Sequence, residues 1–165
     1  MTAHQGTILG LLAAKLDERE IHHLYDPAKR VIFSQHGTEQ FFCEIKVFAA
    51  IDDSESLFVS AYDSGIPPER RSEAAELLIR LNNEDFCLPP LGMNFETGRI
   101  GMSCRLHGPL DQMPSEAAAE ALWNAFHSVA LHSAICGAAI RELLRGGTVQ
   151  EAMEAHGREM DRLRA

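Results

Sequence analysis

Apolar residues alternate with a period of two along several stretches of the chain, and this pattern predicts β-strands. Residues 40–51 carry apolar side chains at every odd position, so this odd set is expected to face the core. Residues 99–106 alternate as cleanly, with Ile100, Met102 and Cys104 among the inward positions. The predicted strands are 21–25, 31–35, 40–51, 56–62, 91–96 and 99–106.

Other stretches repeat their apolar residues every three or four positions, which is typical of amphipathic helices. The predicted helices are 5–19, 69–83, 116–145 and 148–163. Thr2 or Thr7 could cap the first of them. Thr148 and Glu151 fit a capping box that starts the last helix.

The predicted elements follow the order α-β(β)ββ-α-ββ-α-α. Strands grouped in this way, with helices before, between and after them, favour an α+β fold in which an antiparallel sheet carries helices on one face. With 165 residues, the chain is expected to form a single domain, 1–165. Its core is predicted at about 20–147, followed by a C-terminal helix at about 148–163.

The charge of the chain limits the partners that it is expected to bind. The formal net charge is −9, and the 15 Lys and Arg residues are scattered along the sequence. A chain of this charge is repelled by nucleic acids and by anionic membranes unless a basic patch compensates. We therefore expect neither nucleic acid nor a membrane as a partner, and a neutral or basic protein instead.

Cysteine spacing and hydropathy indicate a cytoplasmic protein. None of the four cysteines forms a C-x-x-C pair, so buried free thiols in a reducing compartment are expected. The apolar run 8–16 contains Lys15 and is followed by charged residues, which suits a helix better than a signal peptide. No run approaches the roughly 18 apolar residues of a membrane span.

Four aromatic residues are predicted to share the second face of the central strands, together with Glu44 and Lys46. These aromatic residues are Phe42, Phe48, Phe58 and Tyr62. So many aromatic side chains on an outer face need a cover. The cover is either another element of the chain, a dimer mate, or a segment of a partner protein that docks there.

The long helix holds the only tryptophan, Trp123, next to an apolar stripe that includes Phe126. Packing in the core or in a dimer is one reading of these two residues, and a hot spot for a different partner is the other.

Residues suited to catalysis or to metal binding are not arranged in a recognisable motif. His127 and His132 are five positions apart, whereas metal-binding pairs on helices are usually three or four apart. His22 and His23 are neighbours, so in a strand they point to opposite faces. We therefore expect no metal, no cofactor and no catalytic residue.

Several weak signals in a fixed order resemble the YbjN family. They are residues 39–61 as a central strand pair, Pro67-Pro68-Glu69-Arg70-Arg71 as a helix start, Leu78-Ile79-Arg80-Leu81-Asn82 as a helix end, and Gly92-Met93-Asn94-Phe95 with Thr97-Gly98-Arg99-Ile100 as a second hairpin. The segment Cys87-Leu88-Pro89-Pro90 departs from the family pattern. The resemblance implies a fold similar to type III secretion chaperones and a small dimeric bacterial sensory transduction regulator without catalysis.

Two functional hypotheses follow. The first is a non-enzymatic chaperone-like or regulatory protein that homodimerises and binds a partner polypeptide, in bacterial signalling or stress regulation, through the four aromatic residues. The alternative is a small-ligand-binding or enzymatic module with an anion site near Arg99, Arg105 and His107, which lie on or beside the polar side of one strand.

Overall fold

The structure, a computed structural model, describes residues 7–38, 41–51, 53–84 and 89–165. The helices are α1 (Ile8–Glu18), α2 (Arg71–Glu84), α3 (Ser115–Leu144) and α4 (Val149–Arg164), with short 3-10 turns at Pro68–Arg70 and Leu110–Gln112. The strands are β1 (His23–Asp26), β2 (Val31–Thr38), β3 (Phe41–Ala49), β4 (Glu55–Tyr62), β5 (Leu91–Met93) and β6 (Ile100–His107). This order confirms the predicted α+β fold.

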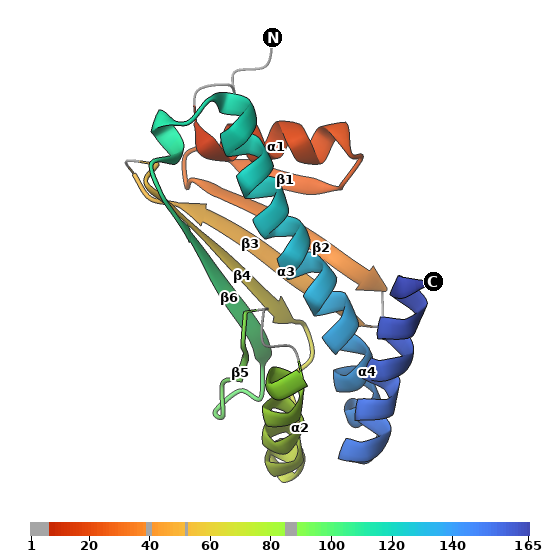
Figure 1. The fold of residues 1–165 in the computed structure, drawn as a ribbon. Coiled ribbons are helices and arrows are strands. Elements are labelled where there is room, and N and C mark those ends of the chain that lie inside the picture. Colours follow the sequence, from red (N-terminus) through yellow and green to blue (C-terminus); the bar gives the residue numbers. More distant parts are fainter. Residues whose placement is uncertain (1–6, 39–40, 52, 85–88) are drawn as a thin grey trace.

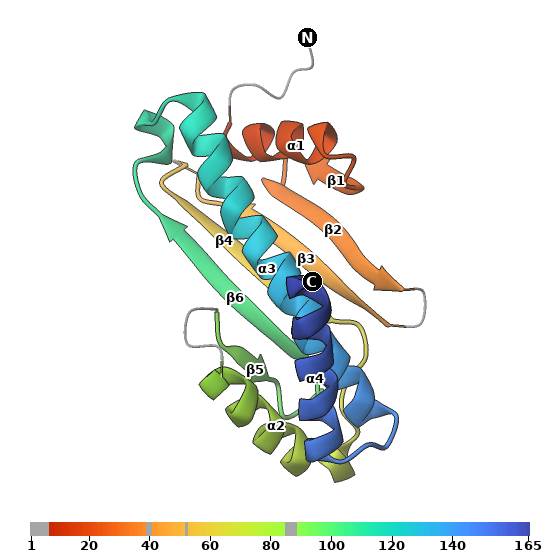
Figure 2. The same cartoon turned by 45° about the vertical axis from the view of Figure 1, so that its right-hand side comes forward.

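The six strands form one antiparallel sheet in the order β1-β2-β3-β4-β6-β5. Helices α1, α3 and α4 lie on one face of this sheet, and α3 crosses it diagonally (Figures 1 and 2). Helix α2 lies at the end of the molecule, where it contacts β5 and α4. No helix or strand of the described part covers the opposite face, which we call the open face.

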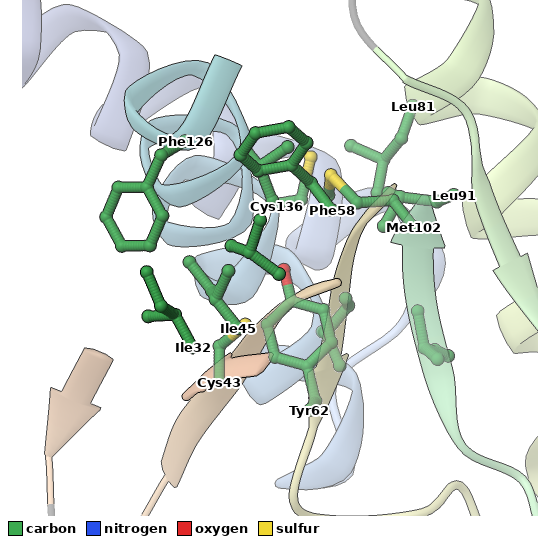
Figure 3. Close-up of a cluster of buried hydrophobic side chains, with 14 of the residues drawn as sticks. Ile32, Cys43, Ile45, Phe58, Tyr62, Leu81, Leu91, Met102, Phe126 and Cys136 are labelled. Atoms are coloured by element: carbon green, nitrogen blue, oxygen red, sulfur yellow. The ribbon is translucent and has the colours of Figure 1, made fainter. Parts of the chain in front are cut away.

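The core lies between the sheet and α3 (Figure 3). Ile45, Phe58 and Phe126 are buried there, and α1 adds Leu12 and Leu16, both 0% exposed. Burial of these apolar side chains is the main driving force for the fold. The hydrophobic core therefore extends from Ile8 in α1 to Ala152 in α4.

Two helix starts form as the sequence predicts. The side chain of Thr7 accepts a hydrogen bond from the Gly10 amide (3.1 Å), which selects Thr7 over Thr2 as the cap of α1. Thr148 and Glu151 form the complete capping box of α4. Both caps satisfy amides that the first helical turn leaves without partners.

Two strands end earlier than predicted. β5 stops at Met93, because the side chain of Asn94 accepts hydrogen bonds from the amides of Glu96 and Thr97 and turns the chain. Phe95, predicted to point inward, is consequently 60% exposed. β3 stops at Ala49, and Ile51, also assigned to the inward set, lies in the following turn and is exposed.

The α-helices of the described part range from 11 residues in α1 to 30 residues in α3. None of them combines enough length with enough apolar character to cross a membrane.

Candidate functional site

The four aromatic residues predicted to share one face are divided between the two faces of the sheet. Strand register pairs Phe58 with Val47 and Tyr62 with Cys43, which places both aromatic rings on the core face. Their exposed fractions are 0% and 1%. The predicted shared face is therefore wrong for Phe58 and Tyr62.

Phe42 and Phe48 do lie on the open face, as predicted. Phe48 is 39% exposed, and Phe42 is half-buried beside the cavity described below. The register places Phe48 between Val31 and Leu57, so these three side chains form a row across three strands.

A second row continues this apolar surface. Leu24, Phe33 and Val59 lie in it, with Lys46 between the last two. Leu24 is 63% exposed, and the Lys46 ammonium lies 5.8 Å from the centroid of the Phe33 ring. We call the six apolar members of the two rows the open-face patch: Leu24, Val31, Phe33, Phe48, Leu57 and Val59.

The three residues of the alternative hypothesis do not form one site, because Arg99 lies apart from Arg105 and His107. Arg99 and Arg105 are six positions apart along one extended segment, which corresponds to roughly 20 Å. Arg105 forms an ion pair with Glu55, and His107 Nδ1 lies 3.3 Å from the same carboxylate. Arg99 lies 3.8 Å from Glu44. Each arginine thus has its own carboxylate partner, at opposite ends of β6.

The two residues predicted to pack in a dimer occupy different environments. Phe126 is 1% exposed and lies within the core, with its ring 5.6 Å from that of His36, so its prediction as a dimer contact is wrong. Trp123 is half-buried on α3 and packs against the edge of the core. It stacks on His127 at 5.3 Å, and the Arg19 guanidinium lies 4.2 Å from its ring.

The structure adds a cavity that the sequence did not indicate. It has a volume of about 340 Å³ and is lined by the end of β2, by α3 and by the C-terminal part of α4. Its lining comes from five elements, with Gly37 from β2, Phe42 from β3, Tyr62 from β4, Ser133 and Gly137 from α3, and Arg162 from α4. Small residues on α3 leave this space open, because Ala134 has only a methyl group as its side chain and Gly137 has no side chain.

A chain of buried hydrogen bonds forms one wall of the cavity. The Cys43 thiol lies 2.8 Å from the hydroxyl of Ser60, which lies 2.6 Å from that of Ser133. The Tyr62 hydroxyl donates to the carbonyl of Ser133 (2.6 Å), and Figure 3 shows Tyr62 with its oxygen directed towards α3. Polar groups buried without such partners would be costly, so these contacts make the wall compatible with the core.

His36 lies at the β2 side of the cavity, and its neighbours indicate its tautomer. Ser34 donates its hydroxyl proton to the carbonyl of His22 (2.8 Å), so it can only accept from His36 Nε2 (3.0 Å). In the neutral ring, Nε2 then carries the proton and Nδ1 is an acceptor. No partner of Nδ1 is found among the described residues.

Burial favours the uncharged forms of three titratable groups of the cavity. It raises the pKa of the Cys43 thiol, raises the pKa of Tyr62 well above its ordinary value, and lowers the pKa of His36. A cysteine nucleophile requires a lowered pKa, so Cys43 lacks the activation that catalysis needs.

Positive charge is found only where the cavity is lined by the ends of α3 and α4. Arg162 forms a bidentate contact with Glu159, with distances of 3.1 Å and 2.5 Å. The hydrogen bond from Arg162 lowers the pKa of Glu159, and the charge of Arg141 adds to this effect. Arg141 has no ion pair within 4 Å in the described part of the chain, so these three residues together carry one net positive charge.

The metal-ligating side chains of the described residues do not gather into a metal site. The described residues contain no group of three or more His, Cys, Asp or Glu side chains placed to hold a metal ion. Cys43 and Cys136 carry buried thiols and Cys104 a half-buried one, whereas Cys87 lies outside the described residues.

Comparison of the sequence with protein-family models and with curated proteins finds no match. The structure confirms the α+β architecture that the YbjN resemblance implies, and the family membership itself stays a prediction.

Proposed function

We propose that this chain is a non-enzymatic chaperone-like or regulatory protein that forms a homodimer and binds a partner polypeptide over the open-face patch. The main evidence for this proposal is the open-face patch. Leu24 and Phe48 are exposed apolar residues on a sheet face that no described helix covers. Contiguous apolar surface of this kind is typical of protein-interaction sites.

Charges around the patch support a polypeptide as the partner. Glu44 and Glu55 alternate with Lys46 and Arg105 on the same face, in ion pairs that remain partly exposed. An apolar centre with a mixed polar rim is the usual composition of a protein interface. The net charge of −9 favours a neutral or basic partner segment.

The test uses an unfolded client, reduced α-lactalbumin, whose aggregation is followed by light scattering. The wild-type protein is expected to slow aggregation, and the double variant Leu24→Ser/Phe48→Ser to lose this effect. The matched control is Ile51→Ser/Ile79→Ser, which removes two exposed apolar residues outside the patch. Equal protection by both double variants would refute the assignment of the patch.

The dimer is tested separately by the mass of the wild-type protein in solution. A mass of twice the chain is expected, and Trp123→Ala is expected to reduce it, because Trp123 is a large aromatic residue that keeps part of its surface exposed. If Leu24→Ser/Phe48→Ser yields the monomer and Trp123→Ala does not, the patch is the dimer interface and the proposed docking of a partner over it is wrong.

A further inference from the structure

We propose that the cavity between the sheet and helices α3 and α4 binds a small amphipathic anion, a carboxylate with an apolar body. The site is on the other side of the sheet from the open-face patch, so the proposal is independent of the protein-binding function. It rests on the size of the cavity, its lining and the charges beside it.

The size and lining suit a small organic molecule. A volume of about 340 Å³ is at the lower end of the range for ligand pockets, roughly 300–1,000 Å³. Ala134 and Ala138 of α3 offer apolar surface. The hydroxyls of Tyr62, Ser60 and Ser133 already have partners within the protein, so this wall presents few unpaired donors to a ligand.

The charged residues determine the sign of the ligand's charge. Arg141 and Arg162 line the cavity together with Glu159, which is already held by Arg162. Arg141 is therefore the cation left to bind an anionic group, within a chain whose net charge is −9. A carboxylate placed against a guanidinium forms a charge-assisted hydrogen bond, which is stronger than a neutral one.

The uncharged groups of the cavity determine which part of the ligand lies against them. Cys43 and Tyr62 keep their protons and His36 stays neutral, because burial disfavours their charged forms. An apolar body meets no buried charge there. The predicted orientation has the apolar body against Ala134 and Ala138 and the carboxylate at Arg141.

Sodium octanoate is the probe that tests this proposal. Octan-1-ol and acetate are the control compounds, each of which has one of the two features of octanoate. Binding is followed by the backbone amide signals of isotopically labelled protein. Millimolar octanoate is expected to shift the signals of Gly37 and Gly137, which line the cavity, and to leave those of Gly92 and Gly108 unchanged. Octan-1-ol lacks the negative charge and acetate lacks the long apolar chain, so each is expected to bind more weakly than octanoate.

Two arginine variants test where the carboxylate of octanoate binds. Arg141→Gln is expected to weaken octanoate binding by about tenfold or more, since it removes a hydrogen bond to a charged group. The matched control Arg145→Gln removes the exposed arginine that caps the C-terminus of α3 and does not line the cavity, and octanoate binding should be unchanged. The amide spectra of both variants show directly whether the fold is retained.

Three results would overturn the proposal. They are an absence of shifts with millimolar octanoate, shifts confined to open-face residues such as Val59, and octan-1-ol binding as tight as that of octanoate. Ala138→Phe, which places a ring in the cavity, should abolish the shifts of Gly37. Retention of octanoate binding by a folded Ala138→Phe protein would equally exclude the cavity as the site.

Discussion

The hydroxyl oxygens of Ser60 and Ser133 lie 2.6 Å apart and join the middle of the sheet to α3, although the two residues are 73 positions apart in the sequence. Both serines are buried, with exposed fractions of 1% and 2%. The Cys43 thiol extends the contact on the sheet side. Ser60 thus faces the core from β4 and finds its hydrogen-bond partners there.

Ser133→Ala is expected to lower the free energy of unfolding by about 1–3 kcal/mol, because it removes one hydrogen-bond partner of the buried Ser60 hydroxyl. Urea unfolding measures this loss. The double variant Ser60→Ala/Ser133→Ala removes both hydroxyls, so it should cost less than the sum of the single variants. Additive losses would show that the two hydroxyls do not depend on each other for stability.

Phe58 and Phe48 are expected to differ strongly in their contribution to stability. Phe58→Ala leaves a cavity in the core and should lower the free energy of unfolding by about 3–5 kcal/mol. Phe48→Ala, on the open face, should change it by less than about 1 kcal/mol. Both values come from urea unfolding, and similar losses for the two variants would contradict the register that pairs Val47 with Phe58.

The register of β4 shows how far the sequence could predict the sheet. In β3 only the odd positions are uniformly apolar, so the core face of Cys43, Ile45 and Val47 was predicted correctly. In β4 both sets contain apolar residues, since Leu57 alternates with Phe58. The faces then depend on the pairing set by the preceding turn, and a shift of one residue exchanges them.

Ser56 and Ser60 add to this ambiguity, because serine is usually an exposed residue. Both are buried on the core face of β4. For Ser60, the compensating partner is a residue of α3 that no local pattern reveals. The cavity was unpredictable for the same reason: its lining is contributed by three strands and two helices, and no sequence motif connects them.

Stability is expected to depend on His36 in mild acid. Burial lowers its pKa in the folded protein below the ordinary value of 6.5, so the unfolded chain binds more protons as the pH falls below that value. The contribution of His36 therefore reduces the free energy of unfolding between about pH 7 and pH 5, by up to about 1.4 kcal/mol per pH unit.

His36→Gln should remove this part of the pH dependence, measured as the urea midpoint from pH 5 to pH 7. His22→Gln is the control, because His22 is an exposed histidine of the same region and should leave the dependence unchanged. Parallel pH profiles for wild type and His36→Gln would show that His36 is protonated as readily in the folded protein as in the unfolded chain.

Gly98 is expected to tolerate no side chain, because its backbone has a φ of +72° and packs against Ile66. A Cβ atom at this position would lie 2.1 Å from the Ile66 carbonyl oxygen, and the Ile66 amide donates to the Gly98 carbonyl at 2.8 Å. Gly98→Ala should therefore lower the free energy of unfolding by about 1–3 kcal/mol or more. Gly92→Ala is the matched control, since a Cβ there meets nothing within 4 Å, and its unfolding midpoint in urea should stay close to that of the wild type. Equal stability of the two variants would mean that the close contact between the β5–β6 turn and the segment leading into α2 does not contribute to the fold.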